Sequence, residues 1–103
     1  MEGIYLIHIR EFINSQENIY KIGESIDMDK QLRRYPNGSI VLFRMKCKES
    51  KKCKEYLKEI LKVKFIQKTY YGNDYFEGDD DEMINEIHNY LYIHNISEVT
   101  NNL

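Results

Sequence analysis

The chain has 103 residues and a formal net charge of −2, with 42% hydrophobic and 31% charged residues. This length supports one domain with a single modest core, and the apolar content excludes a wholly disordered chain. The longest apolar runs are far below the ~20 residues that a membrane-spanning helix needs, and no signal peptide opens the sequence. We therefore expect a soluble, intracellular protein that does not contact a membrane.

The cysteines and histidines argue against a disulfide framework and against structural zinc. Cys47 and Cys53 are the two cysteines of the chain, too few for the disulfide scaffold of a small secreted domain. His8, His88 and His94 are scattered, and no C-x-x-C pair is present, whereas a structural zinc site needs about four closely spaced ligands. We expect two free thiols and no zinc.

Charge is separated along the chain. Residues 44–68 carry ten Lys or Arg against three Glu, whereas residues 74–86 carry seven acidic residues and no basic one. This pattern fits either a nucleic-acid surface beside a divalent-metal site or two solvated helix faces. The candidates for sequence-independent contacts with a DNA backbone are Arg44, Lys46, Lys51, Lys54 and Lys58.

Three segments have the composition of strands. Residues 3–9 and 19–22 are rich in β-branched and aromatic residues, which predicts two strands joined by the polar connection 14–18. Residues 39–47 alternate in a way that predicts a third strand, buried mostly on both sides at its start.

Three helices follow from capping residues and apolar spacing. Ser25 or Asp27 can cap the first helix and Ser50 the second, and the acidic run 79–82 opposes the positive end of the dipole of the third. The helices are predicted over residues 27–35, 50–65 and 79–91.

The resulting order of elements is β-β-α-β-α-α, so the predicted fold class is α+β. No low-complexity linker, composition break or repeat divides the chain. We expect one domain over residues 1–93 and a C-terminal tail over residues 94–103.

Several short motifs occur in this order along the chain. Gly3-Ile-Tyr5 opens the first predicted strand, and Tyr20-Lys-Ile-Gly23 closes the second. Arg10-Glu-Phe12, Tyr35-Pro-Asn-Gly-Ser39 and Gly72-Asn-Asp-Tyr-Phe-Glu-Gly78 follow at matching places. Together they resemble the GIY-YIG nuclease superfamily, and within it the T5orf172-like branch found in phages and large DNA viruses. The resemblance implies a three-stranded antiparallel sheet flanked by helices, and metal-assisted hydrolysis of a DNA phosphodiester.

The resemblance also implies roles for residues of the first two motifs. Tyr5 corresponds to the tyrosine that acts as a base or positions water, and Lys21 stands at the place of the second tyrosine. Tyr20 is one position earlier and thus on the opposite face of a strand, where it would serve as packing. A tyrosine with its ordinary pKa of ~10 is a poor base at neutral pH, so Lys21 or a metal must lower that pKa. Without the later motifs, the preferred interpretation of Tyr5 is an aromatic residue that fills the core.

Further roles fall on the first helix and on the segment before the third. Gln31 stands where the superfamily carries an arginine, and Arg34, on nearly the same helical face, can supply that charge. Asp74 corresponds to the metal-binding glutamate, with Glu77 as the rival ligand for Mg²⁺ or Mn²⁺. The acids of residues 79–82 are assigned to helix capping and solvent.

The sequence thus predicts a minimal metal-dependent DNA endonuclease, located in the cytoplasm, or in the nucleus of a host if the protein is viral. The alternative is a module of the same fold with a degraded site, which binds nucleic acid or a protein partner without cleaving. Sequence specificity would come from the module itself, a homodimer or a partner chain. Tyr70 and Tyr71 either stack on a base or sugar or cover an edge of the core.

Overall fold

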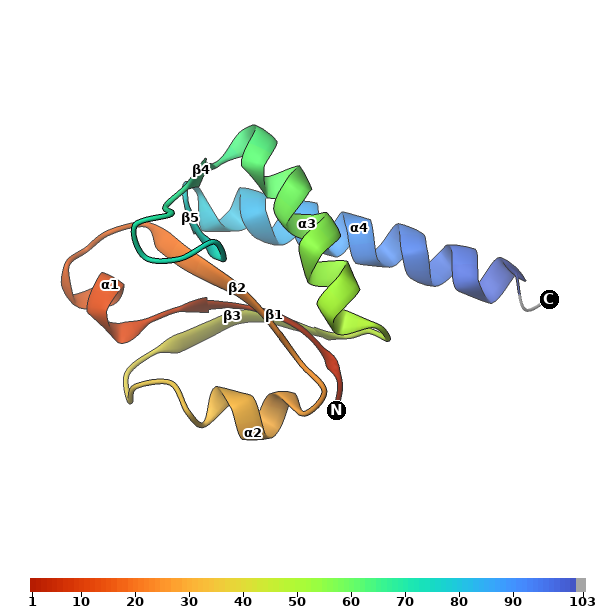
Figure 1. Cartoon of the computed structure of the whole chain (residues 1–103), viewed down its shortest axis with the longest axis horizontal. Helices are drawn as coiled ribbons and strands as arrows, with labels where there is room; N and C mark the ends of the chain where they lie inside the picture. The colour runs from red at the N-terminus through yellow and green to blue at the C-terminus, as the bar shows by residue number, and fades with distance from the viewer. Residues whose placement is uncertain (102–103) are drawn as a thin grey trace.

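The structure, a computed structural model, describes the backbone of residues 1–101 and the side chains of residues 1–94. An antiparallel sheet and four helices form an α+β fold (Figure 1), which confirms the predicted class. The elements in chain order are β1 (Gly3–His8), α1 (Arg10–Asn14), β2 (Ile19–Ser25), α2 (Met28–Leu32), β3 (Ile40–Lys46), α3 (Ser50–Lys64), β4 (Ile66–Gln67), β5 (Tyr75–Glu77) and α4 (Asp80–Asn101).

The sheet has five strands in the order β3-β1-β2-β5-β4. Tyr5 of β1 lies opposite Gly23 of β2 on one side and opposite Arg44 of β3 on the other. Lys21 of β2 lies opposite Tyr75 of β5. This register brings both short motifs and the segment before α4 onto three adjacent strands.

The prediction of a three-stranded sheet is wrong, because β4 and β5 add two strands to it. These strands have two and three residues, too few to show the alternation of apolar and polar residues that identifies a strand in a sequence. They form because β5 pairs with β2, which is far away in the chain, and β4 then pairs with β5.

Two further local expectations differ from the structure. The connection between β1 and β2 contains the short helix α1, which buries Phe12. The start of β3 is not buried on both sides, since Ile40 is 51% and Val41 39% exposed. The physical reason is the sheet order, which makes β3 an edge strand.

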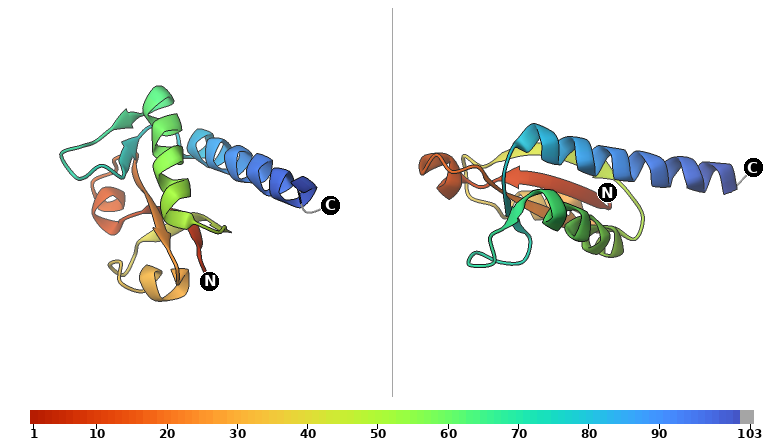
Figure 2. Two further views of the ribbon diagram at one scale, coloured as in Figure 1. Left: turned by 45° about the vertical axis from the view of Figure 1, so that its right-hand side comes forward. Right: turned by 90° about the horizontal axis from the view of Figure 1, so that it is seen from above.

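Two apolar layers lie on opposite faces of the sheet. Ile4, Leu6 and Ile22 pack with the buried residues of α3 and α4. Tyr5 and Ile7 point the other way and pack with residues that include Phe12 of α1 and Met28 of α2. Figures 1 and 2 show α2 across the sheet from α3 and α4. Because β1 is covered on both faces, its apolar residues are buried without alternation.

The ends of α3 and α4 also differ from the predicted ones. Glu49, with φ of 51°, occupies the N-cap position of α3, so the prediction of Ser50 as the cap is wrong. The Ser50 hydroxyl instead lies 3.0 Å from carboxylate oxygens of both Glu2 and Glu24. Helix α4 continues to Asn101, so most of the expected tail is helical, and residues 102–103 lie outside the described part.

None of the described helices combines the length and the apolar character needed to cross a bilayer. The longest of them, α4, extends beyond the sheet toward its C-terminal end (Figure 1).

Candidate functional site

The sheet face that carries Tyr5 is the face on which the motif residues meet. Because side chains alternate along a strand, Lys21 shares this face with Tyr5, whereas Tyr20 points to the other layer. There Tyr20 is 5% exposed, and its ring centroid lies 4.6 Å from that of His8. The structure thus brings Lys21, and not Tyr20, onto the face of Tyr5.

Tyr35 completes the group around Tyr5. The hydroxyl oxygens of Tyr5 and Tyr35 are 2.7 Å apart. The Lys21 ammonium nitrogen lies 5.1 Å from the centroid of the Tyr35 ring and 5.8 Å from that of Tyr75, and it also hydrogen-bonds Tyr35. Tyr35 had no role in the sequence prediction, although it begins one of the motifs that carry the resemblance.

The pKa directions of these groups define their protonation at neutral pH. Burial, followed by the hydrogen bond with Tyr35, raises the pKa of Tyr5 well above its ordinary value. Burial alone would lower the pKa of Lys21, but its hydrogen bond and charge interaction with Tyr35 outweigh burial and raise it. The expectation that Lys21 lowers the pKa of Tyr5 is therefore wrong for this arrangement. Tyr5 stays a neutral phenol and Lys21 a cation.

The hydroxyl groups of Tyr5 and Tyr35 share one hydrogen bond in which either oxygen can be the donor. Gln31 also hydrogen-bonds the Tyr5 hydroxyl, and the Lys21 ammonium donates to Tyr35. Side chains from α2 and β2 thus meet at this pair of phenol oxygens.

Helix α2 positions Gln31 and the turn that follows it positions Arg34. Asp27 begins this helix by accepting a hydrogen bond from the Lys30 amide at 3.2 Å. Gln31 and Arg34 line one shallow cavity of about 330 Å³ together with Lys30. Arg34 is exposed, and none of the side-chain hydrogen bonds or ion pairs of the described residues joins it to Tyr5, Lys21 or Tyr35.

Asp74 is held by two lysines of α3. Its carboxylate oxygens lie 3.0 Å from the ammonium of Lys54 and 3.0 Å from that of Lys58. Burial opposes ionisation of Asp74, but these two hydrogen bonds outweigh burial and lower its pKa. This pairing is not evident in the sequence, because Asp74 is 20 residues from Lys54 along the chain. Asp74 also acts electrostatically on Lys21.

Glu77 lies on the same sheet face as Tyr75, two residues further along β5. Its cross-strand partner is Ile19, whereas the partner of Tyr75 is Lys21. Among the described residues Glu77 forms no ion pair. Glu77 thus has uncommitted oxygens but lies further from Tyr5 along the sheet than Asp74, whose carbonyl oxygen accepts the Ile22 amide at 3.0 Å.

Carboxylate oxygens are the ligands that Mg²⁺ and Mn²⁺ prefer. Asp74 offers such oxygen ligands, but in the structure its carboxylate is already engaged by two positive charges. A divalent ion carries the same total charge as the two lysines. Its binding to Asp74 requires Lys54 and Lys58 to release the carboxylate.

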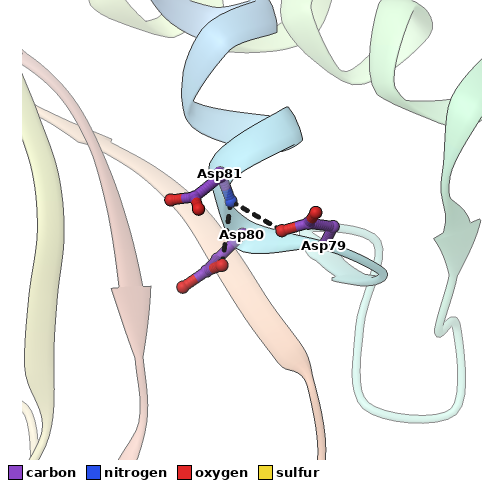
Figure 3. Close-up of side chains that lie close together, drawn as sticks. All are labelled: Asp79, Asp80 and Asp81. Carbon is purple, nitrogen blue, oxygen red and sulfur yellow. Dashed lines mark hydrogen bonds between the residues drawn. The ribbon is translucent and has the colours of Figure 1, made fainter.

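Asp79, Asp80 and Asp81 form a separate acidic cluster at the start of α4 (Figure 3). The Asp81 amide donates to side-chain oxygens of Asp79 and Asp80 at 3.0 and 2.8 Å. These bonds satisfy an amide that the helix leaves without a partner. The cluster is therefore accounted for by helix capping.

The five candidates for DNA-backbone contacts fall into two groups. Arg44 pairs with Asp29 at 2.8 Å, and Lys54 and Lys58 hold Asp74. Lys46 and Lys51 are exposed and form no ion pair within the described residues. These last two side chains are the ones that present uncompensated charge.

Comparison with known proteins adds no relative. No family model matches the chain, and no curated protein or solved structure matches it. The resemblance to the GIY-YIG superfamily accordingly rests on the motifs and their order.

Proposed function

We propose that the chain is a DNA endonuclease that binds the scissile phosphate beside Lys21 and depends on Mg²⁺ or Mn²⁺. The observation that carries this proposal is the group formed by Tyr5, Lys21, Gln31 and Tyr35, in which residues from separate motifs converge on one sheet face. Phosphoryl transfer needs fixed donors and positive charge around the phosphate. This group offers both.

Each side chain of the group has a definite part in the proposal. Lys21 neutralises a non-bridging phosphate oxygen, and the Tyr35 hydroxyl donates to another. Tyr5, a buried neutral phenol, fixes Tyr35 through their 2.7 Å hydrogen bond. Arg34, exposed in the turn after α2, adds a further positive charge. In this scheme Tyr5 is a positioning residue and not the base.

Asp74 is the residue that would hold the metal ion. The ion supplies Lewis acidity and a nucleophilic water at neutral pH. Before it binds, Lys54 and Lys58 must leave the Asp74 oxygens, and both ammonium groups are then available to the DNA backbone. As long as Asp74 pairs with them, the two lysines are not free to bind the DNA backbone near the phosphate site.

The same ion pairs favour a second candidate function, binding without hydrolysis. Lys58 is buried at 8% exposure, and its own pKa is raised by the hydrogen bond with Asp74, which outweighs burial. If the lysines keep Asp74 permanently, no ion binds and the Tyr5 face recognises a phosphate only.

Nicking of supercoiled plasmid at low salt separates the two functions. Wild type is expected to nick with Mg²⁺ or Mn²⁺ and to stop with chelator, and Asp74→Asn is expected to retard the plasmid on a gel without nicking it. Glu77→Gln, which changes the other carboxylate, is the matched control and should retain activity. Plasmid that is retarded but never cut by wild type refutes the endonuclease and leaves the binding module.

A further inference from the structure

A cavity of about 410 Å³ lies next to the candidate phosphate site. Its lining includes Phe12 of α1, Tyr71 of the β4–β5 loop and Tyr75 of β5, together with Glu11 and Glu17. Pockets for small organic groups have volumes of roughly 300–1,000 Å³. The cavity has this size and shares one residue, Tyr75, with the group around Lys21.

The three rings form an aromatic wall. The centroids of Phe12 and Tyr71 are 4.9 Å apart, those of Phe12 and Tyr75 6.0 Å, and those of Tyr71 and Tyr75 6.2 Å. Phe12 is 8% exposed, whereas Tyr71 is 42% exposed. The rings meet edge to face, with interplanar angles of 80° and 63° for the pairs that include Phe12. Phe12 is thus held in the core, while the more exposed Tyr71 offers the ring on which a planar aromatic group can stack.

The charges around the three rings differ from place to place. Glu11 and Glu17 line the cavity, Glu11 also pairs with Arg10 at 3.2 Å, and carboxylates accept hydrogen bonds from the amino groups of bases. The Lys21 ammonium lies 5.8 Å from the centroid of Tyr75, a ring that also lines the cavity. A cation and an acidic aromatic cavity that meet at Tyr75 match the two ends of a nucleotide.

We propose that this cavity binds one unpaired nucleobase of the DNA strand whose phosphate lies at Lys21. The substrate class is then DNA with an unstacked nucleotide, such as a bulge, a flap or a gap, in preference to continuous duplex. Bases inside a duplex are covered by their neighbours and cannot reach a side-chain wall without paying for unstacking. The inference rests on the phosphate site of the proposed function but does not require hydrolysis.

The test is a fluorescence-anisotropy titration in chelator, where no cleavage takes place, with a short duplex and with the same duplex carrying one bulged adenine. Wild type is expected to bind the bulged DNA about tenfold more tightly, because stacking on a protein ring contributes about that factor per base. Tyr71→Ala should lose this preference, and Tyr71→Phe should keep it.

Tyr92→Ala is the matched control, because Tyr92 lies on α4, is 54% exposed and is not part of the cavity lining. Equal affinity of wild type for the two DNAs overturns the inference, as does a preference that depends on Tyr92 and not on Tyr71. A bulge preference without nicking in Mg²⁺ or Mn²⁺ upholds the pocket and refutes the endonuclease. Nicking with equal affinity for both DNAs upholds the endonuclease and refutes the pocket. Absence of binding to either DNA refutes both the pocket and the endonuclease.

Discussion

Gly23 lies directly against the ring of Tyr5. The two residues are cross-strand partners, and a Cβ at Gly23 would lie 2.2 Å from Cζ of Tyr5 and 2.4 Å from its hydroxyl oxygen. The missing side chain of one motif therefore makes room for the tyrosine of the other. This close approach is what lets the Tyr5 hydroxyl reach Tyr35 across β2.

Gly23→Ala is expected to lower the free energy of unfolding by about 1–3 kcal/mol, because overpacking forces the Tyr5 ring to move. Thermal or denaturant unfolding measures the loss. In a Tyr5→Leu background, which removes the ring, the same substitution should cost clearly less. An equal cost in both backgrounds would show that the ring is not what excludes a side chain at Gly23.

Elements with local signals could be predicted from the sequence. Asp27 caps α2 as one of the two residues expected to do so, and Leu57 and Leu61 of α3 are buried as their spacing indicates. Helix α1 escaped prediction because, unlike α2, it is not capped by a side chain at its N-terminus. Strands β4 and β5 escaped prediction because they have two and three residues, and β5 forms by pairing with β2, which is distant in the chain.

Of the arrangement around Tyr5, only the placement of Tyr5 and Lys21 on one sheet face could be predicted from the sequence. It follows from the order of the motifs and from the alternation of side chains along each strand. The bonds of Asp74 to Lys54 and Lys58 depend on how α3 crosses the sheet, and no spacing in the sequence encodes that crossing. The pKa of Tyr5 likewise depends on its burial between layers, which raises it.

Asp74→Asn tests the ion pairs through pH dependence. The pKa of folded Asp74 lies below its unfolded value of 3.8, so its contribution to stability is present above that value and is lost as the pH falls through the folded pKa. The variant should lose about 1–3 kcal/mol at neutral pH, because Lys58 keeps only Glu55 as a partner. Its stability should then fall less than that of wild type on acidification below about pH 5.

Unfolding by denaturant between neutral and acidic pH measures both the loss of stability at neutral pH and the fall in stability on acidification. Glu59→Gln is the matched control, since the Glu59–Lys62 pair is exposed and a surface pair contributes little. Parallel pH curves for wild type and Asp74→Asn would contradict the predicted role of the two lysines.

The two thiols should react at different rates. Burial, and after it the neighbouring Cys53, raises the pKa of Cys47 to about 12, so almost no thiolate forms at neutral pH. Cys53 is half-buried and should be alkylated first in the native protein, as peptide mass spectrometry can locate. Cys53→Ser should leave only the slow reaction. Equal rates at both positions would mean that the end of β3 opens readily.

Tyr35→Phe tests the hydroxyl that we propose donates to the phosphate. The variant removes the donor and also leaves the Tyr5 hydroxyl without its partner at 2.7 Å. DNA affinity in chelator is expected to fall about five- to tenfold. Tyr92→Phe on α4, where Tyr92 is 54% exposed, should change nothing. Unchanged affinity in Tyr35→Phe would remove Tyr35 from the phosphate site.

The most direct test of the central claim, that the face of Tyr5 and Lys21 acts on a DNA phosphate, is the nicking of supercoiled plasmid by Lys21→Met beside Lys62→Met. Each variant removes one positive charge, but Lys62 pairs with Glu59 on the exposed surface of α3, outside the group. We predict that Lys62→Met nicks nearly as wild type does in Mg²⁺ or Mn²⁺, and that folded Lys21→Met does not nick. Equal nicking by the two variants would contradict the account.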